Sequence, residues 1–333
     1  MKEEARAPCS CLVRQKPSLP EELPFEPKME NVGRMNKWIL DRYASSTLKC
    51  THKRLTLIDA EPIKIAIDPK AKPVVVKNPA PVPLHFKEEV KKGLMEDVSM
   101  GILEKVPMGE KTTWQHRMHV VSKPDGRPRR TVDLRSLNKV CRRDAHFVNP
   151  PYKQAREIPR RQLKTATDAW NGYHSCPLDV ESQPLTTFVT EWGRFRYATS
   201  PQGYMASGDG YNARFDKIIE EVERKTKCVD NVALWDEESD VAGHWWQVLK
   251  FLNLVGQNGV TLNPEKFQFC REEILFAGFV ITKEEVKPPT KILESIRKFN
   301  HPTNISEGGP EVLVRLDQSS VALQRYQQRD GGF

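Results

Sequence analysis

The chain has 333 residues, a formal net charge of +8, 38% hydrophobic residues and a mean hydropathy of −0.59. No stretch approaches the ~20 consecutive apolar residues of a membrane-spanning helix, which excludes a membrane protein. Seven Trp, seven Tyr and thirteen Phe can furnish a core, which argues against wholesale disorder; the length predicts roughly two domains, or one domain with tails.

The first 83 residues are rich in proline and predict a linker that contains one helix. Residues 1–30 hold five prolines and show no periodicity. Apolar residues recur at helical spacing over 29–44, which predicts the helix. Residues 62–83 hold six more prolines, which would confine any strands there to sheet edges. We therefore expect a domain boundary near Leu84.

Residues 84–304 predict a domain of α+β class. Apolar residues every four positions over 86–98 indicate an amphipathic helix that ends at Gly101. Pro124-Asp125-Gly126 between two β-prone runs predicts a hairpin. The remaining predictions are a hairpin around Gly193, a helix over 208–225, a buried strand over 228–235, a helix over 241–255, a hairpin strand over 274–282 and a helix over 288–299. These elements alternate without a regular βαβ period, which favours α+β.

The cysteines predict an intracellular protein, either cytoplasmic or nuclear. There are seven, an odd number, and five of them stand far apart. Only Cys9 and Cys11 are close, and no paired spacing is typical of a zinc site or a disulfide framework. The N-terminus lacks the apolar core of a signal peptide.

Positive charge is concentrated in one segment. Between Val120 and Thr165, thirteen Lys and Arg stand against four acids, a net charge of +9, so the rest of the chain carries −1. A phosphate-binding surface is expected to have this charge pattern. A solubilising basic loop has the same pattern, so charge alone leaves the two interpretations even.

Two acids lie inside otherwise apolar runs. Asp168 falls in TATDAWNGYHSCPL, and Asp230 falls in KCVDNVALWD beside Asn231. A buried carboxylate is costly unless it is hydrogen-bonded or meets a metal ion. On pattern alone the structural hydrogen bond is the commoner explanation, and a metal site is the alternative.

Several segments carry a more specific signal when they are taken together. In chain order they are VVSKPDGRPRRTVDLRSLNK, TDAWNGYHSCPL, GRFRYATSPQGYMAS, KCVDN, GVTLNPEKFQF and ILFAGFVITKEEVKP. They resemble, in the same order, the polymerase motifs of reverse transcriptases (RNA-directed DNA polymerases), specifically those in the pol polyprotein of Gypsy-type LTR retrotransposons. KCVDN stands where the family has YxDD or CxDD. The resemblance extends from about Pro83 to Asn304.

The resemblance implies a right-hand polymerase core, with fingers and palm around a small antiparallel sheet that carries Asp168 and Asp230. The reaction would be template-directed DNA synthesis from deoxynucleoside triphosphates on a primed RNA or DNA template. Two Mg²⁺ ions, for which Mn²⁺ can substitute, would be the cofactors. The expected partners are therefore nucleic acid and nucleotides, with no membrane and no indication of an oligomeric state.

The resemblance also assigns roles to residues. Asp168 and Asp230 would be metal ligands, with the Ala169 carbonyl as a third oxygen, beside Asn231. Lys266 would be the general acid for the pyrophosphate leaving group. Nucleotide contacts are expected from Lys123, Arg129, Ala169, Tyr173, Gln202 and Gly203. Nucleic-acid contacts are expected from Arg130, Arg135, Phe276, Ala277, Gly278 and Phe279. The ordinary alternatives are exposed basic side chains on a hairpin and aromatic side chains in the core.

The sequence departs from the family at Asn231, where the paired acids are normally Asp-Asp. An amide keeps one oxygen and loses the charge, which predicts impaired polymerisation. A non-catalytic nucleic-acid-binding relic of a retrotransposon is therefore one alternative, and an unexpressed pseudogene product with a marginal fold is another.

The C-terminus departs further, since residues 305–333 do not continue the family pattern. Codon degeneracy permits a frameshifted tail after about Glu307, which the nucleotide sequence of the gene would test. We also find no protease motif and no integrase zinc signature. The sequence therefore predicts a truncated and degenerate polymerase fragment.

Overall fold

The computed structural model describes residues 15–50, 55–123, 125–237, 240–290 and 294. The described residues up to Lys287 form the first compact unit, and a division of the chain falls before Pro288. Pro124, Cys9, Cys11, the tail from 305 and nearly all of the helix expected over 288–299 lie outside the described residues. In the described part, no helix is long and apolar enough to cross a membrane.

A four-stranded antiparallel sheet in the first unit positions Asp168 and Asp230. Its strands, in spatial order, are β7 (Lys225–Cys228), β8 (Asn231–Trp235), β4 (Lys164–Asp168) and β9 (Gln268–Arg271). In the β4–β8 pairing, Asp168 stands directly opposite Asn231. Because β7 and β8 are joined by a two-residue turn, Asp230 lies at the same end of the sheet as Asp168.

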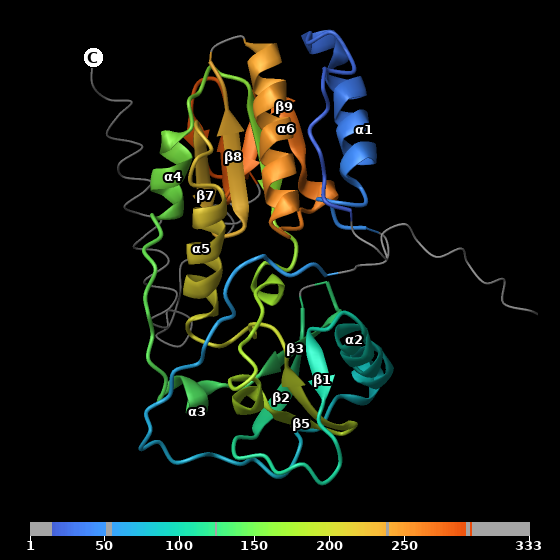
Figure 1. Ribbon diagram of the computed structural model, residues 1–333, viewed down its shortest axis with the longest axis vertical. Helices are drawn as coiled ribbons and strands as arrows, with labels where there is room; N and C mark the ends of the chain where they lie inside the picture. Colours follow the sequence, from blue (N-terminus) through green and yellow to red (C-terminus); the bar gives the residue numbers. More distant parts are fainter. Residues whose placement is uncertain (1–14, 51–54, 124, 238–239, 291–293, 295–333) are drawn as a thin grey trace, which may run out of the picture. The chain divides into compact units, whose positions relative to one another are not determined.

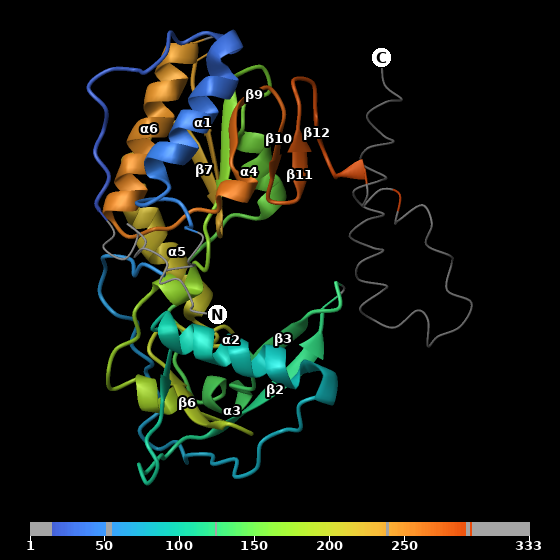
Figure 2. The ribbon, with the colours of Figure 1, turned by 90° about the vertical axis from the view of Figure 1, so that its right-hand side faces the viewer.

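Helices cover both faces of this sheet, which explains why all of β4 and the centre of β8 are buried. The helices are α1 (Val32–Tyr43), α4 (Pro151–Glu157) and α6 (Val241–Gln257). Val232 and Leu234 of β8 belong to the core cluster that includes α1 and α6. Ala233, between them, belongs to the cluster that includes α4. Figures 1 and 2 show α1 and α6 beside one face of the sheet and α4 beside the other.

A second, five-stranded sheet lies beside α2 (Lys87–Ser99). Its strands, in spatial order, are β1 (Leu103–Lys105), β6 (Gly193–Tyr197), β5 (Phe188–Thr190), β2 (His116–Ser122) and β3 (Pro128–Val132). The predicted hairpins are present as β2–β3 and β5–β6, and Gly101 ends the α2 region at a φ of 72°. Only the β2–β5 pair among these strands is parallel.

The remaining elements connect and extend the two sheets. They are the short helix α3 (Arg135–Asn138), helix α5 (Ser207–Ile218) and a three-stranded sheet of β10 (Ile274–Phe276), β11 (Phe279–Ile281) and β12 (Val286–Lys287). The predicted hairpin over 274–282 is therefore present as β10–β11. The five described cysteines are free.

Two predicted elements differ from the structure. The helix expected over 208–225 ends at Ile218, before an acidic run that is unfavourable at the negative end of a helix dipole. The single strand expected over 228–235 is a hairpin, because the chain turns at Val229 and Asp230. That turn contains no Gly and no Asn-Gly pair, so the usual turn signal is missing from the sequence.

The proline-rich residues 62–83 pack against the rest of the first unit. Ile63 and Ile67 form isolated bridges with Leu178 and Cys141, and Val75 forms one with Gln115. Ile63, Ile65 and Val82 are buried in the core. The boundary expected near Leu84 stays a prediction.

We expect His244, a fully buried residue of α6, to make the stability of the chain depend on pH. Its Nε2 forms a 2.8 Å hydrogen bond with Thr165 Oγ1, and burial lowers its pKa to about 4. In the unfolded chain His244 takes up a proton near pH 6.5, whereas in the folded chain it stays neutral until about pH 4. The free energy of unfolding should therefore fall as pH drops from 6.5 towards 4, by about 2 kcal/mol from this residue at pH 5.

Urea titrations at pH 7 and pH 5 would measure this loss. His174, whose pKa burial also lowers to about 4, should add to it. The variant His244→Gln should lose less stability than the wild-type chain between the two pH values. An equal loss in both proteins would contradict the assignment to His244.

Candidate active site

The carboxylates of Asp168 and Asp230 meet at the end of the four-stranded sheet. Asn231 Nδ2 donates to Asp168 Oδ2 at 3.0 Å and to Asp230 Oδ1 at 3.1 Å. The two acids, far apart in the sequence, thus share one hydrogen-bond donor. Asp168 is 7% exposed, so this arrangement is partly withdrawn from water.

Lys266 supplies a cation to the Asp168 carboxylate. It ends the 3₁₀ turn η6 (Pro264–Lys266), and its Nζ lies 2.9 Å from Asp168 Oδ1. Burial raises the pKa of Asp168, the hydrogen bond from Lys266 lowers it, and the charge of Asp230 raises it again. Lys266 itself is largely exposed, so its ammonium lies at the border between the carboxylates and solvent.

The turn that presents Asp230 has an unusual backbone. Val229 adopts a φ of 57°, a left-handed conformation that is costly for a β-branched residue. The Asp230 carbonyl accepts a hydrogen bond from Ala169 N–H at 2.8 Å, which ties the turn to the chain just after Asp168. The structure therefore brings Ala169 next to Asp230 through its backbone.

The hairpin β10–β11 contacts the oxygen end of the Asn231 side chain. Ala277 N–H points to Asn231 Oδ1 at 3.4 Å, so both ends of the amide are engaged. Ala277 and Gly278 form the hairpin turn with φ values of 47° and 83°. Phe276 is fully buried and Phe279 is half-buried, so packing alone accounts for the first of these two aromatic rings.

Tyr173 lies close to the acids. Its ring packs edge-on against Tyr211 with centroids 5.7 Å apart, and its hydroxyl faces Gly208 of α5. Burial raises the pKa of Tyr173, and the charges of Asp230 and Asp209 raise it further. The phenol therefore stays protonated beside the negative charge of Asp230.

The predicted basic contacts lie on or next to the five-stranded sheet. Lys123 and Arg129 are exposed on the β2–β3 hairpin. Arg130 lies 2.9 Å from Asp97 of α2, and Arg135 lies 2.6 Å from Asp133. Arg130 and Arg135 are thus paired with acids of the chain, which leaves Lys123 and Arg129 as the better placed of these four.

Gln202 and Gly203 lie in a loop that Asn138 holds in place. Asn138 was not singled out from the sequence. Asn138 of α3 donates to the Gly203 carbonyl at 2.8 Å and accepts from Met205 N–H at 3.0 Å. Gly203 has a φ of 99°, which favours glycine. No sequence pattern identifies Asn138, because its partners are backbone groups distant in the sequence.

The donor set partly fits a divalent ion. Mg²⁺ prefers oxygen ligands from carboxylates and carbonyls, and Asp168 and Asp230 converge on one point. No cluster of three His, Cys, Asp or Glu suited to a metal exists among the described residues. The Nδ2 of Asn231 occupies the point of convergence, so the amide must rotate away before a cation can take that place.

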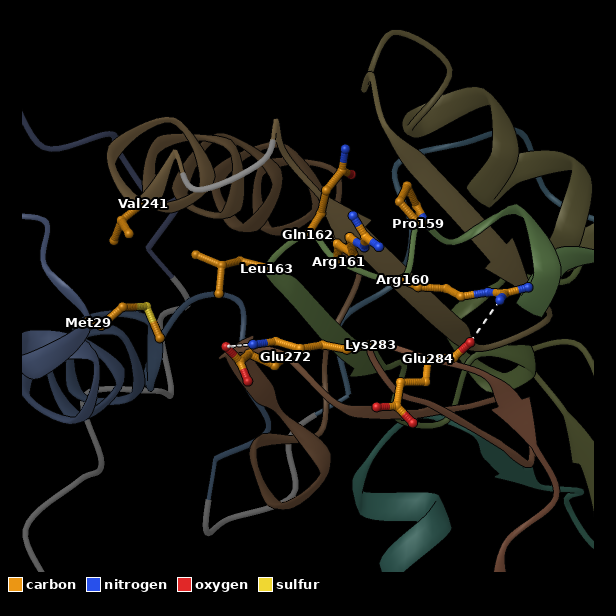
Figure 3. A pocket seen from close by; sticks show the side chains of 10 residues that line it. All are labelled: Met29, Pro159, Arg160, Arg161, Gln162, Leu163, Val241, Glu272, Lys283 and Glu284. Atoms are coloured by element: carbon orange, nitrogen blue, oxygen red, sulfur yellow. Dashed lines mark hydrogen bonds and ion pairs between the residues drawn. The ribbon is translucent and has the colours of Figure 1, made fainter.

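A separate depression of about 900 Å³ lies at the opposite end of β4 (Figure 3). Two contacts join its lining residues, since Lys283 lies 2.6 Å from Glu272 and Arg160 donates to the Glu284 backbone carbonyl at 2.7 Å. The fully buried Lys164 donates to the backbone carbonyls of Arg160, Gln162 and Glu272. These contacts are structural, so the carboxylate end of the sheet remains the candidate site.

Comparisons with known proteins give this chain a set of relatives. Residues 121–281 match the family described as Reverse transcriptase (RNA-dependent DNA polymerase). The enzymatic polyprotein of Cauliflower mosaic virus (strain D/H) is 29% identical over 183 residues, which cover 54% of this chain and 26% of that protein. The Pol polyprotein from transposon opus of Drosophila melanogaster is 24% identical over 189 residues, covering 56% and 19%. The chain thus spans about a quarter or less of these relatives.

Solved structures confirm the predicted α+β fold. The foamy viral protease–reverse transcriptase in complex with dsDNA superposes with a TM-score of 0.75 at 19% identity, covering 90% of this chain and 63% of that one. The same protein with an RNA/DNA hybrid gives a TM-score of 0.72 at 19% identity, covering 88% and 40%. The chain therefore contains a reverse transcriptase domain over residues 121–281, with relatives in viral and transposon polyproteins.

Proposed function

We propose that the chain is a nucleotidyltransferase that extends a DNA primer on an RNA or DNA template, with activity weakened by Asn231. The observation that carries this proposal is the convergence of Asp168 and Asp230 on one donor at the sheet end. The family implies nucleotidyl transfer, and its relatives are solved with DNA and RNA/DNA nucleic acid. The Gypsy-type origin and the truncation belong to the same proposal.

When bound, two Mg²⁺ ions would lower the pKa of the primer 3′-hydroxyl and neutralise the triphosphate. Asp168 and Asp230 would hold these ions, and Lys266 would deliver a proton to the pyrophosphate. Lys123 and Arg129 would bind the phosphates of the incoming nucleotide. Tyr173 would lie under the nucleotide sugar, since its ring is fixed by Tyr211 next to Asp230.

A non-catalytic nucleic-acid-binding role is the second candidate, and one observation favours it. The Asn231 amide donates to both carboxylates and the Lys266 ammonium donates to Asp168, so groups of the chain itself occupy positions next to both acids. The place between the two acids is thus filled by a hydrogen-bond donor of the chain itself. Such a protein would bind nucleic acid and incorporate no nucleotide.

A primer-extension assay separates the two functions. The full chain would be given labelled primer on RNA and DNA templates, with Mg²⁺, Mn²⁺ or EDTA, while binding is followed by fluorescence anisotropy. Incorporation that follows the template sequence and disappears in EDTA would support the polymerase. Binding without incorporation in either metal would establish the relic instead.

Nucleic-acid binding is expected to depend on Arg129 and on salt. Each phosphate contact contributes about −0.9 to the slope of log K against log salt on duplex DNA. Arg129→Glu should weaken binding irrespective of sequence and make the slope less negative by about that amount. Arg130 is a poorer test because its reversal also breaks the ion pair with Asp97.

The matched control is Lys37→Glu, the same charge change on the exposed face of α1, outside the basic segment. Anisotropy titrations at several salt concentrations would compare both variants with the wild-type chain. Equal effects of the two substitutions would show that the β2–β3 hairpin is not the contact surface.

A further inference from the structure

A buried lysine stands directly behind the turn that presents Asp230. Lys227 lies on β7, and its side chain is 5% exposed. Its Nζ donates to Asn212 Oδ1 at 2.6 Å and lies 3.1 Å from Asp216 Oδ1, both on α5. A buried ammonium requires such partners, since its desolvation is otherwise costly. The position of this cation is therefore fixed from α5.

The same ammonium also contacts the turn. Nζ lies 3.4 Å from the Val229 carbonyl, which belongs to the peptide group that leads into Asp230. Val229 has a φ of 57°, and a two-residue hairpin turn with positive φ at this position normally takes glycine. A strained peptide needs outside contacts to hold one orientation, and Lys227 provides one of them.

Charge supports the same arrangement. Burial lowers the pKa of Lys227, while the charges of Asp216 and Asp230 act in the opposite direction. Asp216 is fixed in turn, because His146 Nε2 lies 2.7 Å from its other oxygen. The contacts thus run from the segment around His146, through α5, to the turn.

We propose that Lys227 is a positioning residue: its ammonium, held by Asn212 and Asp216, fixes the Val229–Asp230 peptide and thereby the direction of the Asp230 carboxylate. The inference rests on the proposed function only where it treats Asp230 as a metal ligand. Partners one step removed from a metal ligand typically contribute tenfold or more to metal affinity.

The test is Mn²⁺ binding to the full chain, followed by electron paramagnetic resonance, in Lys227→Met and Asn212→Leu. We expect Lys227→Met to weaken Mn²⁺ binding about tenfold and Asn212→Leu to weaken it less. Loss of a nearby positive charge would by itself strengthen cation binding, so weaker binding must come from lost positioning. Unchanged or tighter Mn²⁺ binding in Lys227→Met would overturn the proposal.

The matched control is Lys164→Met, which removes an equally buried lysine at the other end of the same sheet. It should lower the urea midpoint yet leave Mn²⁺ affinity within about twofold. Hydrogen–deuterium exchange gives a readout that needs no metal, because Ala169 N–H reports on the Asp230 carbonyl. We expect Lys227→Met to speed exchange at Ala169 and residues 229–231, and Lys164→Met to leave it unchanged.

The two readouts distinguish the failure of each proposal. If the wild-type chain binds no Mn²⁺, the metal site of the proposed function fails, and exchange alone decides whether Lys227 holds the turn. If exchange at Ala169 is equal in Lys227→Met and Lys164→Met, the positioning role is refuted even where Mn²⁺ binds.

Discussion

Replacing Asn231 with aspartate is expected to raise the rate of Mg²⁺-dependent primer extension more than about a hundredfold. A unit charge pair about 4 Å apart is worth ~4 kcal/mol at an effective dielectric of ~20, and the amide forgoes this attraction to a cation. The amide keeps one oxygen, which reduces the loss, and ~1.4 kcal/mol corresponds to a factor of ten. Single-nucleotide incorporation under saturating template would measure the ratio.

The same substitution should make the stability of the chain depend more strongly on metal. Asn231 Nδ2 links the two carboxylates, whereas an aspartate would place a third negative charge beside them. Asn231→Asp should therefore melt below the wild-type chain in EDTA and gain more Tm on addition of Mn²⁺. Asn78→Asp, on the exposed surface, is the control for the added charge. Equal incorporation by wild-type and Asn231→Asp chains would refute the predicted impairment.

Removal of Asp168 is expected to abolish what activity remains, a loss of at least about a thousandfold from ~4 kcal/mol of missing attraction. The variant Asp168→Ala leaves Asp230 as the single carboxylate at the sheet end, so Mn²⁺ binding should disappear with the activity. Both quantities are measurable on the same preparation, by electron paramagnetic resonance and by primer extension.

The stability of Asp168→Ala should not fall with its activity. Burial raises the pKa of Asp168 despite the hydrogen bond from Lys266, so the ionised carboxylate is held less favourably in the folded chain than in the unfolded one. We therefore expect a Tm in EDTA equal to or above that of the wild-type chain.

Asp236→Ala is the matched control for Asp168→Ala. It removes an equally buried acid that forms an ion pair with Arg224 at 3.0 Å, so it should lower Tm and keep activity. Retained Mn²⁺ binding in Asp168→Ala would contradict the metal-site assignment.

Sequence periodicity predicted the elements whose signals are local. Helix α2 follows from apolar residues every fourth position, and the β2–β3 hairpin follows from the Asp125-Gly126 turn. The turn at Val229 was missed, because contacts to Lys227 and Ala169 stabilise it in place of a residue suited to positive φ.

The residues of the candidate site divide in the same way, into those that the sequence predicted and those that it did not. The position of Asp168 opposite Asn231 follows from strand pairing that the family resemblance implied. Lys227 and Asn138 were not singled out, because a lysine in a strand or an asparagine after a leucine carries no pattern of its own. Their importance depends on α5 and on the loop at Gly203, which only the folded chain brings to them.

Helix α1 has a practical consequence for anyone who wishes to produce this domain. Met35, Ile39 and Tyr43 are fully buried, and the Tyr43 hydroxyl reaches the Leu249 carbonyl of α6. A fragment cut to residues 121–281 would leave the apolar side of α6 facing water, and such a surface favours aggregation. The smallest soluble piece of this protein therefore has to begin well upstream of the segment that family membership defines.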